Sequence, residues 1–314
     1  MEFRHLRCFM AVAEELHFAR AAERLHIEQS PLSRAIKELE EDLGAQLFVR
    51  TTRSTRLTRA GKLFLENVPR VFTALQQARD SVKAAANGFH SQLRVALSDG
   101  IPPSQFSNFL ALCREEEPEI EIRLFEVPLA QQVKGLHDDL YDAGFARSDE
   151  VGDGLIAEAV WNDPLMVAVP ARHPLLKYKR IPLEEILRYP LVVADPHACE
   201  GYSRQIERVL RRVDQEPLIA ERVASVDLMM VLVAAGFALG LAGASQIASS
   251  REPGVLARPL TGRTTMLTTY LLRLDNDPSE ALARFIERTS TLETSVTKKL
   301  TVPPDHDASE EVEP

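Results

Sequence analysis

A run of cationic side chains near the N-terminus could bind phosphate groups. Between positions 50 and 62 the chain carries Lys and Arg but no Asp or Glu, and these residues are Arg50, Arg53, Arg56, Arg59 and Lys62. Lysine and arginine provide most of the affinity for the backbone of a nucleic acid, and arginine also reaches into narrow minor grooves. The alternative is an ordinary solvated surface. The run predicts a contact with nucleic acid.

A group of polar residues lies just before this run, where a helix is predicted to start. Its members are Gln29, Ser30, Pro31, Ser33, Arg34 and Lys37. The acids Glu38, Glu40, Glu41 and Asp42 crowd the other end of the same helix. A helix that enters the major groove contacts bases with its N-terminal residues. The sorting of charge therefore predicts a recognition helix, with Arg50 and Arg53 against phosphates or in the minor groove.

Three helices and a hairpin are predicted to position these side chains. Apolar residues recur at helical spacing over 3–16, a second helix fits 18–25, and Pro31 suits the first turn of a third. Gly44 is a helix stop, and two short strands follow at 47–50 and 55–58. Residues 1–58 are thus predicted to form a winged helix-turn-helix, an α domain with a small β wing.

Residues 59–88 are predicted to form one long linker helix that dimerises. Its apolar stripe is Phe64, Val68, Val71, Leu75, Ala78 and Val82. Steps of three and four residues are typical of a helix that packs against a partner helix. The alternative is a helix packed on its own domain. Pro69 removes one helical hydrogen bond and predicts a kink.

Strands and helices alternate over 89–294, which predicts an α/β effector domain with two lobes and a ligand cleft between them. The first lobe takes about 89–163 and 266–294, and the second about 164–265. The remaining residues, 295–314, end in a stretch with five carboxylates and are predicted to be a disordered tail.

The composition excludes several classes of protein. The 314 residues are 45% hydrophobic and carry a net charge of −9, of which the tail holds a large share. Three cysteines without a CxxC pair suit a reducing cytosol and predict neither a disulfide framework nor a metal site. No apolar run is long enough for a membrane span, and the N-terminus lacks a secretory signal. A cytoplasmic chain without a cofactor or membrane partner is predicted.

An enzyme is the main alternative of another class. The sequence has no HxxxH pair, GxSxG, P-loop or GxGxxG motif, and its acidic runs at 115–117 and 138–139 read as solvated helix faces. A solute-binding protein would share the two lobes but would need a signal peptide and would lack the N-terminal helix-turn-helix. A non-enzymatic DNA-binding protein is therefore predicted.

Five sequence blocks in order resemble the N-terminal signature of LysR-type transcriptional regulators. The blocks are residues 21–25, 29–33, 39–44, 47–50 and 57–61. The resemblance continues to about residue 293. It implies a winged helix-turn-helix, a dimerising linker helix and a two-lobed effector domain of periplasmic-binding-protein type. It also implies three partners: promoter or operator DNA, a small-molecule effector, and further copies of the chain in a dimer or tetramer. RNA polymerase is a further candidate partner.

The resemblance also implies which residues contact DNA, and these are the residues singled out above: Gln29, Ser30, Pro31, Ser33, Arg34, Lys37, Arg50 and Arg53. Glu28, Ser30 and Ala35 depart from the residues that the family most often has there, which affects the half-site that is read. Activation and repression are both compatible with these motifs.

Residues 141–147, 165–175 and 232–236 are similar to the branch of the family that controls aromatic and chloroaromatic catabolism, so an aromatic compound or its ring-cleavage product is a candidate effector. By motif position the cleft would be lined by Ser98, Asp99, Gly100, Ile101, Pro128, Phe145, Gly201, Tyr202, Ser203 and Val226. Pro128 lacks a donor and Asp99 adds negative charge, which predicts a ligand of lower charge than a dianion, or an aromatic one.

A redox-responsive regulator of the same family is the alternative function. Residues 195–199 resemble the site of peroxide-sensing members, and Cys199 would be the reactive thiol. The spacing is shifted by one residue and no second cysteine lies nearby in the sequence, so an unreactive loop cysteine is the competing interpretation.

Overall fold

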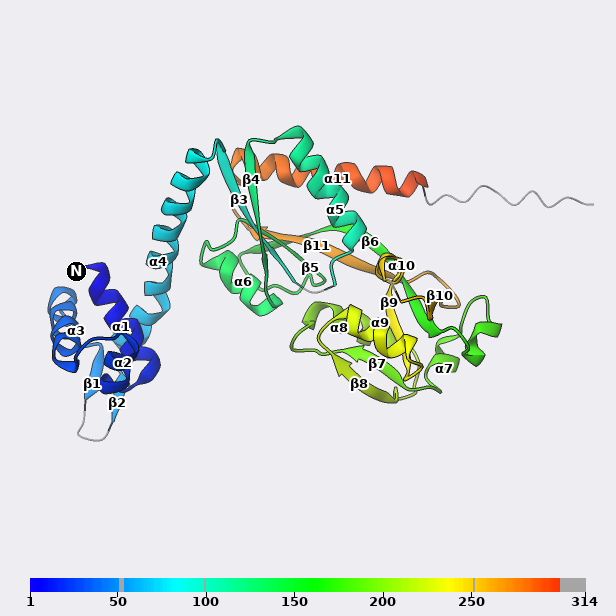
Figure 1. Ribbon diagram of the computed structural model, residues 1–314, viewed down its shortest axis with the longest axis horizontal. Helices are drawn as coiled ribbons and strands as arrows, with labels where there is room; N and C mark the ends of the chain where they lie inside the picture. Colours follow the sequence, from blue (N-terminus) through cyan, green and yellow to red (C-terminus); the bar gives the residue numbers. More distant parts are fainter. Residues whose placement is uncertain (51–53, 99, 251, 300–314) are drawn as a thin grey trace, which may run out of the picture. The chain divides into compact units, whose positions relative to one another are not determined.

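The computed structural model describes residues 1–50, 54–98, 100–250 and 252–299, with the side chains of Arg50 and of residues 291–299 outside the description. The chain divides into two compact units, Met1–Asp80 and Ser81–Pro314. Figure 1 labels the elements of both.

The first unit holds three helices, a two-stranded wing and the start of a long helix. They are α1 (Phe3–Glu15), α2 (Phe18–Arg24), α3 (Gln29–Leu43), β1 (Phe48–Arg50), β2 (Thr55–Leu57) and α4 (Arg59–Ala86). Each of the first three helices turns an apolar face inward, and Phe9, Leu32 and Ile36 are fully buried there. Gly44 ends α3 in the left-handed region with φ +64°, where glycine costs least.

The wing is held by hydrogen bonds from both flanking helices. The carboxylate Oε1 of Glu40 on α3 accepts from the backbone N–H groups of Leu47 (2.8 Å) and Phe48 (3.1 Å). On the other side the Thr58 hydroxyl donates to the carbonyl of Leu47 (3.2 Å) and accepts from the N–H of Gly61 (2.9 Å). A Cβ on Gly61 would lie 2.1 Å from the Leu47 carbonyl oxygen, so only glycine fits.

The apolar stripe of α4 has two environments. Val68 is buried in the core of the first unit, and Phe64 packs partly against the same core. Val71 and Val82 are 42% and 70% exposed. The first half of the stripe therefore packs on its own domain, which is the alternative noted for this helix, and only the second half is open.

The second unit has two lobes. The first is built from β3 (Ser91–Leu97), α5 (Pro103–Glu116), β4 (Ile120–Glu126), α6 (Leu129–His137), β5 (Ala143–Ala146), β11 (Met266–Leu274) and α11 (Glu280–Lys299). The second is built from η1 (Pro174–Lys177), α7 (Leu183–Ile186), β7 (Leu191–Ala194), α8 (Glu200–Leu210), β8 (Ile219–Val223), α9 (Val226–Ala234), β9 (Leu239–Gly243), α10 (Ala244–Ser249) and β10 (Val255–Pro259).

One long strand, β6 (Leu155–Pro170), belongs to both lobes (Figure 1). The strand order is β4-β3-β5-β11-β6-β9-β7-β8, with β10 also paired to β6. Strand β6 pairs with β11 as far as Pro164 and with β9 from Leu165. The predicted boundary between the lobes, between residues 163 and 164, falls inside this strand. Pro164 has no N–H to donate, but it sits where the strand changes partner, so the ladder continues.

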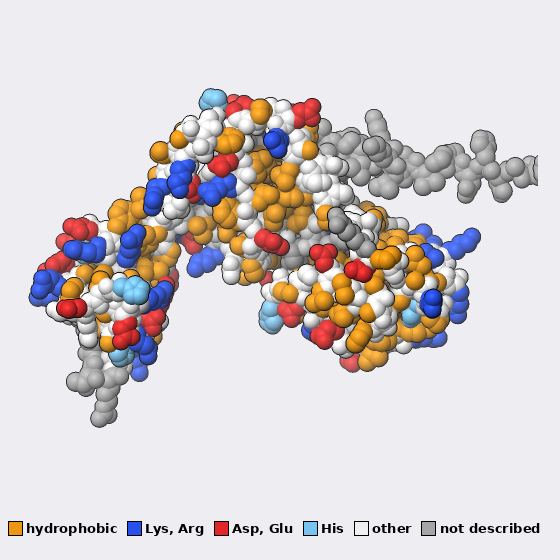
Figure 2. Space-filling model, in the orientation of Figure 1, with side chains coloured by type: hydrophobic (Ala, Val, Ile, Leu, Met, Phe, Trp, Pro, Cys, Tyr) orange, Lys and Arg blue, Asp and Glu red, His pale blue; other side chains and the backbone are white. Residues whose placement is uncertain are grey.

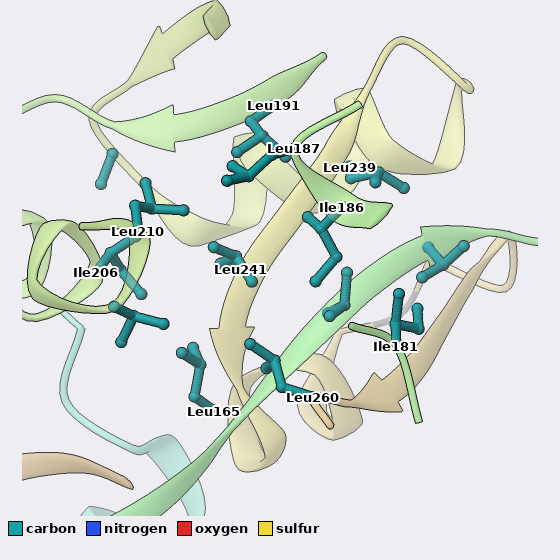
Figure 3. Packing of buried hydrophobic residues seen from close by; sticks show 14 of the residues in the cluster. Leu165, Ile181, Ile186, Leu187, Leu191, Ile206, Leu210, Leu239, Leu241 and Leu260 are labelled. Carbon is teal, nitrogen blue, oxygen red and sulfur yellow. The ribbon is translucent and has the colours of Figure 1, made fainter. Parts of the chain in front are cut away.

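Each lobe has its own hydrophobic core. In the first lobe the rings of Phe145 and Trp161 stack with centroids 4.8 Å apart, and Phe109 and Phe285 surround them. In the second lobe aliphatic side chains from β6, β9 and α8 meet under the sheet (Figure 3). The hydrophobic cores of the two lobes are therefore separate, and the lobes are connected by the backbone pairing of strand β6.

Apolar side chains also gather on the outside of the second lobe, around α9 (Figure 2). Leu228 and Val231 of α9 are 48% and 46% exposed, and Phe237 after it is 69% exposed. These side chains contribute little to the core of their own lobe, so their burial would require a partner.

Helix α11 is fixed to α5 by a cluster of charged side chains. Arg288 bonds to Glu116 (2.5 Å) and to Glu117 (2.6 Å), and Arg284 also pairs with Glu117. Burial acts to raise the pKa of Glu117, but hydrogen bonds from Arg288 and Arg284 outweigh it, so the pKa lies below its usual range. The ionised carboxylate is the form that holds α11.

We expect Glu117→Gln to lower the free energy of unfolding of the second unit by about 1.5–3 kcal/mol at pH 7, because charge-assisted bonds are lost. The pKa of Glu117 is lower in the folded than in the unfolded protein, so its ionised carboxylate stabilises the fold. This contribution is complete above the unfolded pKa, near 4, and is lost as the pH falls through the folded pKa. The deficit of the variant should shrink accordingly in acid. Urea unfolding at pH 7 and in acid measures the difference in the free energy of unfolding between variant and wild type. The exposed Glu115→Gln variant is the control. An equal deficit in both variants would contradict this account.

Candidate functional site

Helix α3 has two faces. The apolar side chains Leu32, Ala35, Ile36 and Leu39 are buried. The opposite face presents the predicted contacts Gln29, Ser30, Pro31, Arg34 and Lys37, which are exposed, and Ser33, which is half-buried. The six residues selected from the sequence therefore lie on one accessible helix face, in the orientation that a groove-reading helix requires.

The acids of the same helix are engaged within the domain. Glu38 lies 3.2 Å from the imidazole Nε2 of buried His5, Glu40 holds the wing, and Glu41 lies 3.5 Å from Lys37. Among the described residues Arg34 makes no ion pair, and it borders hollows on both sides of α3, toward α1 and toward β1. Arg34 is thus a cation available for an external anion.

The wing is only partly described. The side chain of Arg50 and all of Arg53 lie outside the described residues, so their predicted contacts stay predictions. Three further residues of the same basic run, Arg56, Arg59 and Lys62, are exposed and are additional candidates for contacts with phosphates. The unbroken run of cations in the sequence is the signal that indicates them.

A cavity of about 400 Å³ opens between the two lobes of the second unit. Its lining includes predicted residues from both walls, namely Ser98, Gly100, Ile101, Tyr202 and Val226. Asp99 lies outside the described residues. The N-terminal ends of α5, α8 and α9 and the side of α10 form the walls, because all four elements contribute lining residues. The volume suits a small organic ligand.

The other predicted residues are not among those that line this cavity. Pro128 precedes α6, and Phe145 points into the aromatic core of the first lobe. Gly201 lies against the backbone of Arg147, where a Cβ would be 2.9 Å from the carbonyl carbon. The Ser203 hydroxyl donates to the carbonyl of Ala194 (3.1 Å), because one step along α8 from Tyr202 turns the side chain away from the cavity.

Several residues that line the cavity were not predicted from the sequence to line it, although Cys199 was singled out for another role. They are Leu97, Pro103, Phe106, Glu126, Cys199, Ala224, Ser225, Asp227, Gln246 and Ser249. Ser225 caps α9, since its hydroxyl accepts from the N–H of Leu228 (3.3 Å). The sequence pattern Ser225-x-Asp227 before an apolar stretch is typical of a helix start, and it could have indicated that both residues lie at the N-terminal end of α9.

A buried arginine positions the loop at the base of the cavity. Arg147 is 1% exposed; its Nε donates to the carbonyl of Gly100 (2.7 Å) and its Nη1 to that of Leu267 (2.7 Å). Its Nη2 lies 3.9 Å from the carboxylate of Asp163 on β6, and that carboxylate accepts the Ser245 hydroxyl (2.6 Å). One guanidinium thereby joins the loop of Gly100 to β11 and to β6, the strand that both lobes share.

Cys199, the residue of the redox alternative, is 3% exposed and begins α8. Its thiol donates to the carbonyl of Ala224 (3.3 Å). Asp195 accepts the backbone N–H groups of His197 and Ala198, which lowers the pKa of Asp195. The motif from 195 to 199 therefore forms a tight turn into a helix, and this turn accounts for its residues. Cys113 lies in the core of the other lobe, where burial raises its pKa to about 11.

Within the described ranges no cluster of His, Cys, Asp or Glu could hold a metal ion. A search of the same residues finds no helix with the length and hydropathy of a membrane span.

Two family models match the chain. Residues 3–62 match the bacterial regulatory helix-turn-helix protein, lysR family, and residues 86–291 match the LysR substrate binding domain. The chain belongs to the LysR family of transcriptional regulators. The predicted fold class and the main functional prediction, a DNA-binding regulator with an effector domain, are confirmed.

Relatives of this LysR-type regulator cover most of its length. It is 35% identical to the uncharacterized HTH-type transcriptional regulator YnfL of Escherichia coli (strain K12), over 78% of this chain and 83% of that protein. It is 32% identical to BenM of Acinetobacter baylyi, over 78% of this chain and 81% of BenM. Together with ClcR of Pseudomonas putida, BenM confirms the similarity to the branch of aromatic catabolism.

Solved structures align with most of this chain. Full-length CbnR in complex with its target DNA has a TM-score of 0.71 and 27% identity, and the alignment covers 93% of this chain and all of that one (100%). A full-length OxyR from Pseudomonas aeruginosa, at 23% identity and a TM-score of 0.60, shows the shared fold alone.

We expect Arg34→Ala to weaken specific DNA binding about 10- to 100-fold, because a cation on the groove-facing side of α3 is lost. Lys37→Ala, by contrast, should weaken specific and non-specific binding alike and lower the salt slope by about one, as loss of a phosphate contact does. Fluorescence anisotropy over a salt series measures both. Arg188→Ala on the second lobe is the control, and an Arg34→Ala protein that binds like this control would contradict the assignment.

Proposed function

We propose that this LysR-type regulator reads its operator with the exposed face of α3 and holds the flanking phosphates with the basic run from Arg50 to Lys62. The observation that carries the proposal is the division of α3 into a buried apolar face and an exposed face with Arg34 and Lys37. Glu38 and Glu40 of the same helix are engaged by His5 and by the wing. Arg34 makes no ion pair among the described residues, so a cation is available on this face although the whole chain is acidic.

We propose that the effector binds in the cavity between the lobes, where Ser98, Gly100, Ile101, Tyr202 and Val226 contact it. A ligand that touches both walls favours the arrangement in which the lobes lie closer together, which is a shift of population and requires no chemical step. Strands β6 and β11 run through this region, and Arg147 connects them to the loop of Gly100. A change at the cavity is thereby coupled to the strands of both lobes.

Self-association belongs to the same proposal. The open half of the α4 stripe, with Val71 and Val82, offers an apolar seam to a second copy, as residues 59–88 were predicted to do. The exposed apolar side chains over α9 offer a further surface for assembly as a dimer or tetramer.

A bacterial regulator that contacts the chromosome acts in the cytoplasm, and we infer that it carries out no catalysis.

We expect the full-length protein to retard a DNA fragment taken from upstream of its own gene at a concentration about 1,000-fold lower than a fragment of shuffled sequence, because specific sites exceed non-specific binding by that order. A gel retardation assay at physiological salt measures this difference. Equal retardation of the two fragments over the whole concentration range would contradict a role as a sequence-specific regulator at that promoter.

A further inference from the structure

The cavity between the lobes carries negative charge on both walls. Glu126 ends β4 in the first lobe, and Asp227 lies in the first turn of α9 in the second. Both side chains are exposed, and neither makes an ion pair within the part of the chain that the structure describes. The described lining includes neither Lys nor Arg. Two carboxylates that face one site without a cation favour a positively charged group between them.

The cavity also has an apolar surface large enough for the body of a small molecule. Leu97, Ile101 and Phe106 supply it from the first lobe, and Tyr202 and Val226 from the second. Tyr202 is 1% exposed and its hydroxyl donates to the carbonyl of Leu241 (2.7 Å), so its buried ring forms part of the cavity wall. A ligand with a hydrocarbon or aromatic part gains by burial against these side chains.

A buried amide adds a hydrogen-bond donor. Gln246 is 7% exposed and lines the cavity, and its Oε1 accepts the N–H of Gly243 (3.1 Å). That bond fixes the amide with Nε2 as the free end, and the described residues offer Nε2 no acceptor. The residue is buried but this end of the amide borders the cavity, so Nε2 can donate to a ligand oxygen there.

The start of α5 strengthens the attraction for an anionic oxygen. The helix begins after Pro102 with Pro103, has no side-chain cap and has no acid in its first turn. Pro103 lines the cavity. The positive end of the helix dipole is therefore not compensated by a side chain of its own helix, in contrast to α9 with Asp227.

We propose that the effector of this regulator is a small zwitterion of the amino-acid class: an ammonium group held by Glu126 and Asp227, a carboxylate held by Gln246 Nε2 and the start of α5, and an apolar body between Phe106 and Tyr202. The inference rests on the proposed effector role of this cavity. A dicarboxylate would bring two further negative charges between Glu126 and Asp227. The ammonium group instead links carboxylates of opposite lobes and so favours their approach.

The test compares ligands that differ only in charge. Full-length protein is screened by thermal shift with the common amino acids at about 10 mM, a concentration that detects millimolar affinity. Each binder is then compared by calorimetry with the amine and the carboxylic acid of the same skeleton, for example L-phenylalanine, 2-phenylethylamine and 3-phenylpropanoate. The amino acid should bind at least about tenfold tighter than the acid.

Three variants locate the binding. Glu126→Gln with Asp227→Asn should weaken the amino acid about tenfold or more and should not weaken the matched acid, which is no longer repelled by two carboxylates. Gln246→Glu keeps the oxygen that accepts from Gly243 but replaces the free donor with an anionic oxygen, so it should weaken the amino acid and not the amine. Glu216→Gln, an exposed acid outside this cavity, is the control.

The proposal is overturned if no amino acid binds, if a matched acid binds as tightly as its amino acid, or if the double variant binds the amino acid like wild type. Operator retardation is measured on the same preparation. Retained retardation together with any of these results refutes the zwitterion alone, whereas loss of sequence-specific retardation refutes the proposed function itself.

Discussion

A single strand, β6, belongs to both lobes of the effector domain, and the arrangement of that domain depends on this constraint. The strand pairs with β11 along one half and with β9 and β10 along the other, so neither lobe has a complete sheet without it. The buried guanidinium of Arg147 lies where the partners change and is bonded to two carbonyls and faced by Asp163. A charge in that position is stable only while all of these groups are in place. The same guanidinium holds Gly100, so the shape of the cavity and the connection of the lobes rest on one set of bonds.

In the DNA-binding unit the corresponding constraint is the sorting of charge along α3. Acids at its C-terminal half are taken up by His5 and by the N–H groups of the wing. Arg34 and Lys37 then face outward. The total charge of −9 is therefore a poor guide to the surface that matters, because most of the acidic residues lie in the second unit and the C-terminal stretch.

Local signals predicted most of the first unit and less of the second. The apolar spacing of α3, Pro31 in its first turn and Gly44 at its end act over a few residues, so the helix and its exposed face could be predicted. Strand β9, Leu239–Gly243, was missed because its glycines and alanine carry no strand signal and tertiary pairing with β6 and β7 determines it. Pro164 stands at the predicted boundary between the lobes but does not end a strand, because it lies where β6 changes partner.

The cavity shows the same limit. Residues that follow a strand or begin a helix, such as Gly100 and Val226, could be placed by position. Phe145 and Ser203 could not, because a single step along a strand or helix decides whether a side chain faces the core or the ligand. Gln246 and Glu126 line one cavity only because distant parts of the chain pack together, α10 against α5 among them, which no short stretch of sequence reveals.

The central claim is that the outward face of α3 is the surface that reads DNA. Ultraviolet cross-linking of the full-length protein to the DNA upstream of its gene, followed by mass spectrometry of the peptides, tests it directly. Nucleotides attached to peptides that span residues 29–37 are the predicted result, with further attachment in the basic run from 54 to 62. Cross-links confined to residues 86–291, with α3 unmodified, would contradict the account.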